Sequence, residues 1–194
     1  MTPPADLPLI EPANRRQWRD WLEAHHADSP GVWLAVGKKG NPVTDLSYAD
    51  AVEEALCFGW IDSVVNRLDE NRYKQRMTPR RPGSGWARTN KERVARLAGQ
   101  GLLTRAGIAA IDAAKADGSW ARLDEAEALV VPADLAAALA ENEASEGSFA
   151  ALPASTRKQI LHGIGSAKRP ETRANRIHAA VLAAVERREG APGG

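Results

Sequence analysis

The segment from Trp60 to Met77 constrains the fold more than any other, because its hydrophobic period is two while most of the chain follows a helical period. Its two runs, residues 60–68 and 72–77, flank the turn-forming sequence Asp69-Glu-Asn71. Such a pattern is typical of an antiparallel β-hairpin. Residues 32–36 form another short, partly β-branched apolar run, which is predicted to be a further strand. The sequence therefore predicts a small antiparallel sheet of about three or four strands.

Helices are predicted before and after this hairpin. Asn14, Ser47 and Thr104 each stand where a side chain can cap the helix that follows. The predicted helical segments are residues 15–24, 51–56, 90–99, 106–115, 134–142, 155–164 and 170–188. Residues 1–9, which contain three prolines, are predicted to form an extended arm. The fold class is therefore α+β: a small antiparallel sheet packed by helices in a domain of residues 10–121, with a helical C-terminal section, residues 122–188, packed on it.

The composition argues against several classes of protein. The 194 residues are 43% hydrophobic and 26% charged, and the formal net charge is +1, so no bulk attraction to nucleic acid or anionic lipid is expected. The N-terminus has neither a basic region nor an apolar run, and no stretch approaches the ~18 apolar residues of a membrane span. The single Cys57 excludes an internal disulfide and agrees with a reducing compartment. We therefore expect a cytoplasmic protein without membrane insertion.

The sequence carries no recognisable metal or cofactor motif. Its four histidines have no carboxylate partner at ligand spacing, and one cysteine cannot form a cysteine cluster. There is no Gly-rich phosphate loop after a strand, no nucleophile elbow and no dinucleotide fingerprint. Cys57 lies near the C-terminal end of its predicted helix, where the helix dipole disfavours a thiolate, so we expect a buried, inert thiol. The sequence predicts no metal and no cofactor, and it gives no indication of the oligomeric state.

Basic residues concentrate around the predicted hairpin. Residues 67–96 contain ten Lys or Arg and only three Asp or Glu, although the whole chain is nearly neutral. This asymmetry favours an anionic ligand held by arginine forks, with Arg76 and Arg80 as the leading candidates. The alternative is a solvated basic surface whose arginines pair with acids elsewhere. Because side chains alternate along a strand, Tyr73 and Arg76 are expected on opposite faces, so only part of the run can converge.

Asp62 is the carboxylate best placed for chemistry, because it follows Trp60 and Ile61 on the first hairpin strand. A carboxylate beside aromatic rings is either paired with an arginine or raised in pKa. Pairing with Arg76 or Arg80 is one interpretation, and a role as catalytic acid or base is the other. Ser84 and Asn90 can hydrogen-bond a ligand, or they can fix the loop and cap the next helix.

Taken together, these motifs resemble the signature of the YdeI/OmpD-associated family, also called the bacteriocin-protection family. The matching residues are Ala55-Leu-Cys-Phe-Gly-Trp-Ile-Asp-Ser63, Gln75-Arg76, Thr78-Pro79-Arg80, Ser84, Trp86 and Asn90, with Gly31-Val-Trp33 and Ser47-Tyr-Ala-Asp-Ala-Val52 upstream and Pro132, Asp134-Leu135, Phe149, Ser155, Ala167-Lys168, Thr172-Arg173 and Arg176-Ile177 downstream. The resemblance covers roughly residues 10–185. It implies an association with bacteriocin or cationic-peptide resistance and with an outer-membrane porin, although this chain shows no export signal. It also marks Trp60, Asp62, Arg76, Arg80, Ser84, Trp86 and Asn90 as one group.

Three hypotheses for function follow. The leading one is a cytoplasmic stress or resistance protein that binds a small anionic or polar ligand in a cleft lined by Trp60, Asp62, Tyr73, Arg76, Arg80, Ser84 and Trp86. The second is a cofactor-independent enzyme with Asp62 as general acid or base and the two arginines as charge stabilisers. The third is a nucleic-acid binder, which the neutral total charge and the few aromatic residues outside the proposed site argue against. The sequence does not decide whether the protein is an enzyme.

Overall fold

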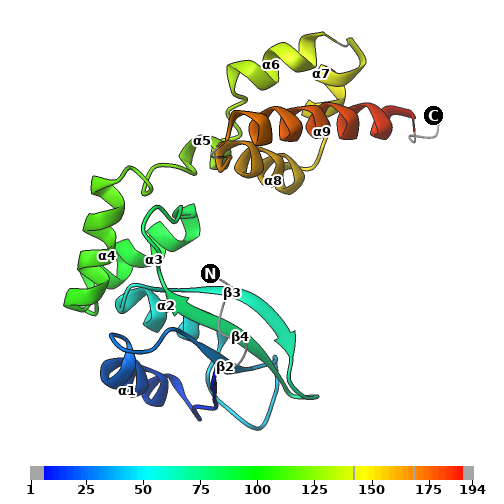
Figure 1. The fold of residues 1–194 in the computed structure, drawn as a ribbon. Coiled ribbons are helices and arrows are strands. Elements are labelled where there is room, and N and C mark those ends of the chain that lie inside the picture. The colour runs from blue at the N-terminus through cyan, green and yellow to red at the C-terminus, as the bar shows by residue number, and fades with distance from the viewer. Residues whose placement is uncertain (1–6, 142, 168, 190–194) are drawn as a thin grey trace. The chain divides into compact units, whose positions relative to one another are not determined.

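The structure is a computed structural model that describes residues 7–141, 143–167 and 169–189 (Figure 1). It consists of two units, which are described separately. Unit 1 contains residues 1–84 and 89–120, and unit 2 contains residues 85–88 and 121–194.

A four-stranded sheet forms the centre of unit 1. Its strands are β1 (Leu9–Ile10), β2 (Val32–Gly37), β3 (Trp60–Arg67) and β4 (Arg72–Pro79), arranged in the order β1-β2-β4-β3. The β2–β4 and β3–β4 pairs are antiparallel, as the hairpin pattern predicts. The β1–β2 pair is parallel. Its strand β1 lies where the predicted extended arm, residues 1–9, ends, so the end of this arm joins the sheet. The predicted α+β class with a small, mostly antiparallel sheet is confirmed.

The β3–β4 hairpin contains a register shift that the sequence did not reveal. Asp62 lies opposite Met77, whereas Val65 lies opposite Gln75, so β3 has one more residue than β4 over this stretch. An insertion of this kind is a β-bulge, which bends the strand and redirects its side chains. The bulge therefore lies next to Asp62, the carboxylate that the sequence singled out.

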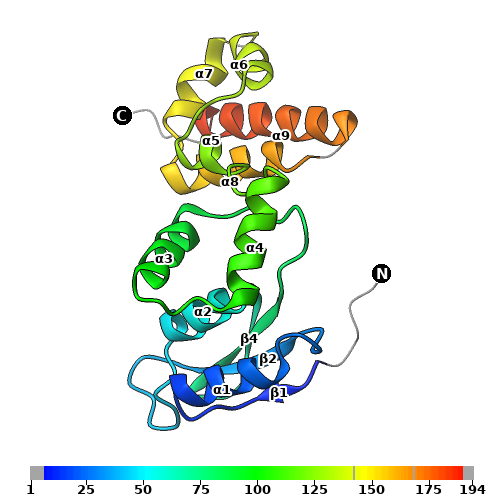
Figure 2. The same cartoon turned by 90° about the vertical axis from the view of Figure 1, so that its left-hand side faces the viewer.

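Four helices complete unit 1: α1 (Arg15–His25), α2 (Tyr48–Cys57), α3 (Arg88–Gly99) and α4 (Arg105–Ala116). Three of them, α1, α2 and α4, begin with the caps that the sequence predicts. The side chains of Asn14, Ser47 and Thr104 accept hydrogen bonds from the backbone N–H groups of Gln17, Asp50 and Gly107. Helix α1 lies in front of the strands in Figure 2, and Trp18 fastens it to α2 by donating to the carbonyl of Ala51 at 3.0 Å.

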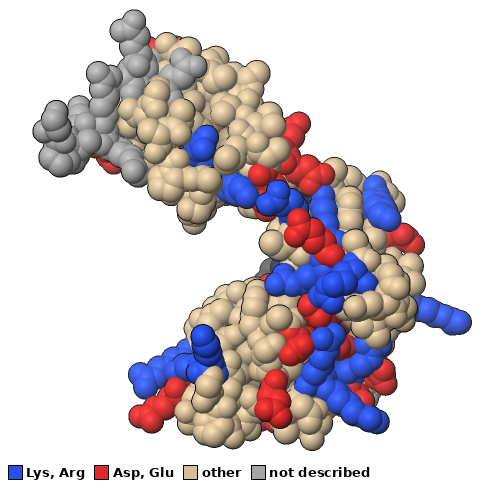
Figure 3. All heavy atoms as spheres, turned by 180° about the vertical axis from the view of Figure 1, so that it is seen from behind, with Lys and Arg blue, Asp and Glu red and all other residues tan. Residues whose placement is uncertain are grey.

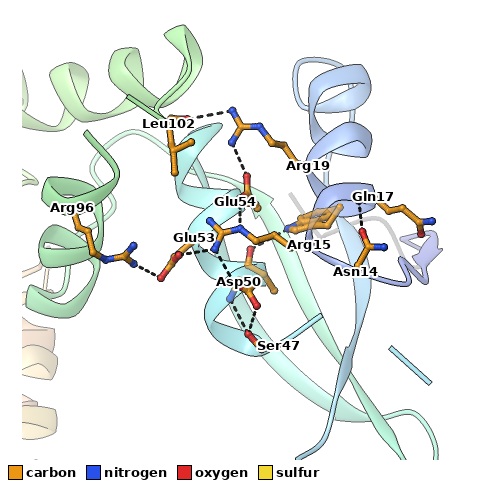
Figure 4. A network of polar contacts seen from close by, with 12 residues as sticks. Asn14, Arg15, Gln17, Arg19, Ser47, Asp50, Glu53, Glu54, Arg96 and Leu102 are labelled. Atoms are coloured by element: carbon orange, nitrogen blue, oxygen red, sulfur yellow. Dashed lines mark hydrogen bonds and ion pairs between the residues drawn. The ribbon is translucent and has the colours of Figure 1, made fainter. Parts of the chain in front are cut away.

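A network of ion pairs ties α1, α2 and α3 together (Figure 4). Glu54 of α2 is only 3% exposed, and its carboxylate contacts Arg15 Nε at 2.5 Å and Arg19 Nη1 at 2.8 Å. Glu53 is 8% exposed and pairs with Arg15 and with Arg96 of α3. Carboxylates this deeply buried are stable only when they are paired and hydrogen-bonded. The three arginines therefore allow α2 to carry charges into the interior of unit 1.

Unit 2 is entirely helical over its described residues. Its helices are α5 (Asp124–Glu127), α6 (Ala133–Ala140), α7 (Glu143–Ala150), α8 (Ala154–Gly165) and α9 (Pro170–Glu189). Its core includes Leu135, Leu139, Phe149, Leu161 and Ile164. The sequence predicted α6, α8 and α9 and missed the two short helices, whose few residues provide no clear apolar stripe. That unit 2 packs on unit 1 stays a prediction.

Arginines of α9 bind the C-terminal end of α8. Arg173 donates to the carbonyl of Ile164 at 3.2 Å and forms two hydrogen bonds with Asp134 of α6, at 2.6 and 2.9 Å. Arg176 donates to the carbonyl of Gly163 and to Ser166 Oγ. The last carbonyls of a helix lack partners within the helix and carry partial negative charge, so arginines are suitable caps there. The two arginines thus add to the bond by which Ser166, the C-cap residue of α8, donates its Oγ–H to the carbonyl of Gly163 at 3.0 Å.

We predict that Gly107→Ala strongly destabilises unit 1. A Cβ at this position of α4 would lie 2.2 Å from the carbonyl oxygen of Cys57 and 2.8 Å from its carbon, both of which are backbone atoms of α2. Overpacking of this kind costs about 1–3 kcal/mol or more. Gly99→Ala, where a Cβ meets nothing within 4 Å, is the matched control and should be neutral or stabilising by up to about 1 kcal/mol. Urea denaturation of both variants measures the difference, and equal stability would contradict the α2–α4 packing.

We also predict that Glu54→Gln destabilises unit 1 by about 1–3 kcal/mol, because it removes the buried charge that contacts both Arg15 and Arg19. The cost is moderated because both arginines are partly exposed and keep other carboxylate partners. Glu23→Gln removes an exposed ion pair with the same Arg19 and should change the free energy of unfolding by less than about 0.5 kcal/mol. A double-mutant cycle with Arg19 measures both coupling energies. Equal values for the two glutamates would show that burial does not strengthen the network.

Candidate functional site

A polar pocket lies between the start of α2 and the β3–β4 hairpin. It has a volume of about 310 Å³ and is lined by Tyr48, Asp62, Ser63, Val65, Tyr73 and Gln75. Tyr48 comes from the N-terminal turn of α2. Strand β3 contributes Asp62, Ser63 and Val65, and strand β4 contributes Tyr73 and Gln75. The pocket therefore depends on how three elements of unit 1 meet.

The pairing register explains why these side chains share one face of the sheet. Gln75 pairs with Leu34 of β2 and with Val65 of β3, and Tyr73 pairs with Val36 and Arg67. Directly paired residues lie on the same face, and successive residues of a strand alternate between the two faces. The bulge keeps Asp62 on this face as well, because Asp62 pairs with Met77, two residues beyond Gln75. A regular strand could not keep both Asp62 and Val65 there.

Asp62 is held by neutral donors. Tyr48 Oη donates to Asp62 Oδ2 at 2.9 Å, and Gln75 Nε2 donates to the same oxygen at 3.4 Å and to the carbonyl of Ser63 at 3.3 Å. Asp62 makes no ion pair with any residue that the structure describes, so neither Arg76 nor Arg80 is its direct partner. Its other oxygen, Oδ1, accepts no hydrogen bond from the described part of the chain. One acceptor therefore remains available.

Gln75 is a fully buried polar residue that lines this pocket. Its exposed fraction is 0%, and its Oε1 atom has no hydrogen-bond partner among the described residues. An unsatisfied buried acceptor costs about 1–3 kcal/mol. Where an unsatisfied polar group lines a pocket, as Gln75 does here, a bound ligand or an ordered water is a common explanation.

Burial and the charge of Asp62 keep the pocket phenols protonated. Burial, assisted by the hydrogen bond to Asp62 and its charge, raises the pKa of Tyr48 to about 12. Burial and the same carboxylate also raise the pKa of Tyr73. Burial lowers the pKa of Arg80 to about 10, against the opposing attraction of Asp62, and this value still leaves Arg80 charged at neutral pH. At neutral pH the pocket thus presents one carboxylate and two neutral phenols.

The structure brings together only two of the residues that the sequence singled out, Asp62 and Tyr73. Trp60 is 1% exposed and belongs to the core, where its ring meets Trp21 edge-on and its Nε1 donates to the carbonyl of His26. Trp86 is also 1% exposed and belongs to unit 2.

Ser84 and Asn90 have local roles. Ser84 donates to the carbonyl of Arg81 at 2.7 Å, and Asn90 accepts from Arg93 within the same helix at 3.2 Å. The sequence left open whether Ser84 binds a ligand or fixes the loop, and this hydrogen bond corresponds to the second role. Asn90 lies inside α3, so it is not the residue that caps this helix.

The basic run does not converge on the pocket. Arg76 pairs with Trp33 and shares the opposite sheet face with Lys74, whose Nζ lies 4.9 Å from the centre of the Trp33 ring. The Nε atom of Arg76 is buried without a hydrogen bond to any described residue. Acidic and basic side chains lie next to one another on the surface seen in Figure 3.

Sequence reasoning did not identify four residues of the pocket as site residues: Tyr48, Ser63, Val65 and Gln75. Gln75 carried a usable signal, since it follows Tyr73 by two positions and must share its face. Tyr48 stands in the motif Ser47-Tyr-Ala-Asp-Ala-Val52, but this motif does not place it beside Asp62, because that approach depends on the tertiary packing of α2.

Other kinds of site find no support within the described residues. No group of three or more His, Cys, Asp or Glu there could hold a metal ion, and none of their helices is long and apolar enough to cross a membrane. The Cys57 thiol is buried, and burial raises its pKa to about 11, so it is protonated at neutral pH.

Two protein families match separate parts of the chain. Residues 10–110, about half of the chain, match a domain of unknown function, DUF8412. Residues 128–186 match the family described as bacteriocin-protection, YdeI or OmpD-associated. No curated protein and no solved structure matches the chain.

This division refines the family resemblance. The downstream residues, from Pro132 to Arg176-Ile177, lie within the region that matches the bacteriocin-protection family. The motif from Ala55 to Asn90, which contains the pocket carboxylate, lies within the other domain. The chain thus belongs to the DUF8412 domain family, whose model covers residues 10–110. Its residues 128–186 match the family described as bacteriocin-protection, YdeI or OmpD-associated.

Proposed function

We propose that unit 1 binds a small polar ligand in the pocket at Asp62, and that the protein serves stress or antimicrobial resistance in the cytoplasm. The observation that carries this proposal is the combination of an available Asp62 oxygen with a fully buried Gln75 on one pocket wall. Ligand sites are usually concave and mostly apolar, with a few placed polar groups. The match to a bacteriocin-protection family supports the resistance role, and the single buried thiol agrees with a reducing compartment.

The geometry favours a donor-bearing polar ligand over an anion. An anion site requires convergent arginines, but Arg76 lies on the other sheet face and no arginine lines the pocket. The only ionised group that lines the pocket is the carboxylate of Asp62. A ligand that offers N–H or O–H groups would satisfy this carboxylate, whereas an anion would be repelled by it.

The same geometry weighs against acid–base catalysis. That mechanism assigned Arg76 and Arg80 as charge stabilisers beside Asp62, and neither of them lines the pocket. A preorganised charge must be aimed at the reacting atoms to stabilise a transition state. Ligand binding at Asp62 requires no arginine in the pocket, so it explains this set of residues better than catalysis does.

The proposal is tested by closing the pocket without touching its polar groups. Val65→Trp places an indole at the pocket wall, and Val65 is already 57% exposed, so the fold should tolerate the change. Val64→Trp is the matched control, because Val64 is 48% exposed on the same strand and does not line the pocket. A screen of small polar compounds by ¹⁵N–¹H NMR should shift the amide signals around residues 48, 62, 73 and 75 in the native protein and in Val64→Trp. These shifts should be lost in Val65→Trp.

Two results would contradict this proposal. One is a screen in which no polar compound shifts these signals in the native protein. The other is a ligand that binds the Val65→Trp protein as tightly as the native one, since the binding site would then lie elsewhere.

A further inference from the structure

We propose that the pocket selects a cationic nitrogen, a primary ammonium or a guanidinium group, with Asp62 as its counter-ion and Tyr48 and Tyr73 as its aromatic walls. This inference rests on the proposed function and names the chemical class of its ligand. It follows from three observations on the geometry and charge of the pocket.

The first observation is the state of the Asp62 carboxylate. Its Oδ2 atom is held by Tyr48 and Gln75, which fixes the orientation of the group, while Oδ1 accepts no bond from the described residues. Both of its partners are neutral, so its negative charge is not cancelled by an ion pair. A charged donor forms a hydrogen bond to a carboxylate that is roughly twice as strong as that of a neutral donor. Oδ1 is therefore a preoriented acceptor for a charged N–H group.

The second observation is the electrostatic potential at the pocket walls. Besides burial, the charge of Asp62 raises the pKa of both phenols, and for Tyr48 this effect exceeds the opposing effect of Arg93. The charge of Asp62 thus acts on Tyr48 more strongly than that of Arg93 does, and it also attracts the buried Arg80 guanidinium. Opposite charges attract, so this carboxylate favours a cation over an anion beside it.

The third observation is the composition of the wall. Two tyrosine side chains and an exposed valine line the pocket together with the carboxylate. A cation over the face of an aromatic ring is attracted by the negative charge density of that face. A pocket of about 310 Å³ is at the small end of ligand sites, which suits one amine-bearing chain.

The test uses a matched series of ligands with the same butyl chain: n-butylammonium, 1-butylguanidinium, n-butanol and butyrate. The full chain is titrated with each, and the amide signals around residues 48, 62, 73 and 75 are followed by NMR. For ligands this small a Kd on the order of 1 mM is expected. The two cations should bind at least about tenfold more tightly than n-butanol and butyrate, because only they place a charge beside Asp62.

Two neutralising variants locate the charge that matters. Asp62→Asn should weaken cation binding by about tenfold or more and bring it close to that of n-butanol. Glu70→Gln removes an exposed carboxylate from the turn of the same hairpin and should leave all four affinities unchanged. If both variants lose the same affinity, the preference is a general surface effect and the inference fails.

A blocked lysine, N-acetyl-lysine methylamide, separates the two sources of an ammonium group. Binding as tight as that of n-butylammonium would extend the site to lysine side chains of peptides, and much weaker binding would restrict it to free amines. Either outcome supports recognition of a cationic nitrogen when it depends on Asp62.

The failure of this inference is distinguishable from that of the proposed function. If n-butanol or butyrate binds the pocket as tightly as the cations, the pocket is a ligand site and only its cation preference is wrong. If none of the four compounds shifts the pocket signals, even at tens of millimolar, and the broader screen also finds no ligand, both the inference and the proposed function are overturned.

Discussion

The register of the β3–β4 hairpin is the constraint on which the site depends. Because side chains alternate along a strand, a register decides which residues can ever meet. The extra residue between Asp62 and Val65 keeps both on the face of Gln75 and Tyr73. The same alternation sends Arg76 and Lys74 to the opposite face. Because of the bulge and the alternation of side chains, the carboxylate pocket lies on one face of the sheet, and basic residues beside Trp33 lie on the other face.

Helix α2 connects this hairpin to the ion-pair network. At about 100° per residue, Asp50, Glu53 and Glu54 lie on one side of the helix, and Tyr48 and Val52 lie on the other. The acidic side faces Arg15, Arg19 and Arg96 (Figure 4). On the opposite side, the Tyr48 hydroxyl donates to Asp62. The network therefore has a consequence for the pocket: by fixing α2, it fixes the tyrosine that orients the carboxylate.

The sequence predicted the local features of unit 1 and not the tertiary ones. The helix caps at Asn14, Ser47 and Thr104 and the two arms of the hairpin follow from residue type and spacing within a few positions, and the structure has them. The position of the bulge does not follow, because Ser63 and Val64 fit a regular strand equally well. The density of arginines from Arg67 to Arg96 suggested convergence, but charge counts along a chain contain no information on which face each residue occupies. Tyr48 could be found only from the packing of α2.

The absence of an arginine from the pocket gives Asp62 its chemical character. A carboxylate paired with a guanidinium has a satisfied charge and serves mainly to fix the structure, as Glu54 does between Arg15 and Arg19. Asp62 instead receives hydrogen bonds from a phenol and an amide, which orient it without neutralising it. Unit 1 thus contains two classes of carboxylate that differ in their partners. The buried, ion-paired class supports the helices, and the neutral-bonded class at the pocket keeps its charge available to a ligand.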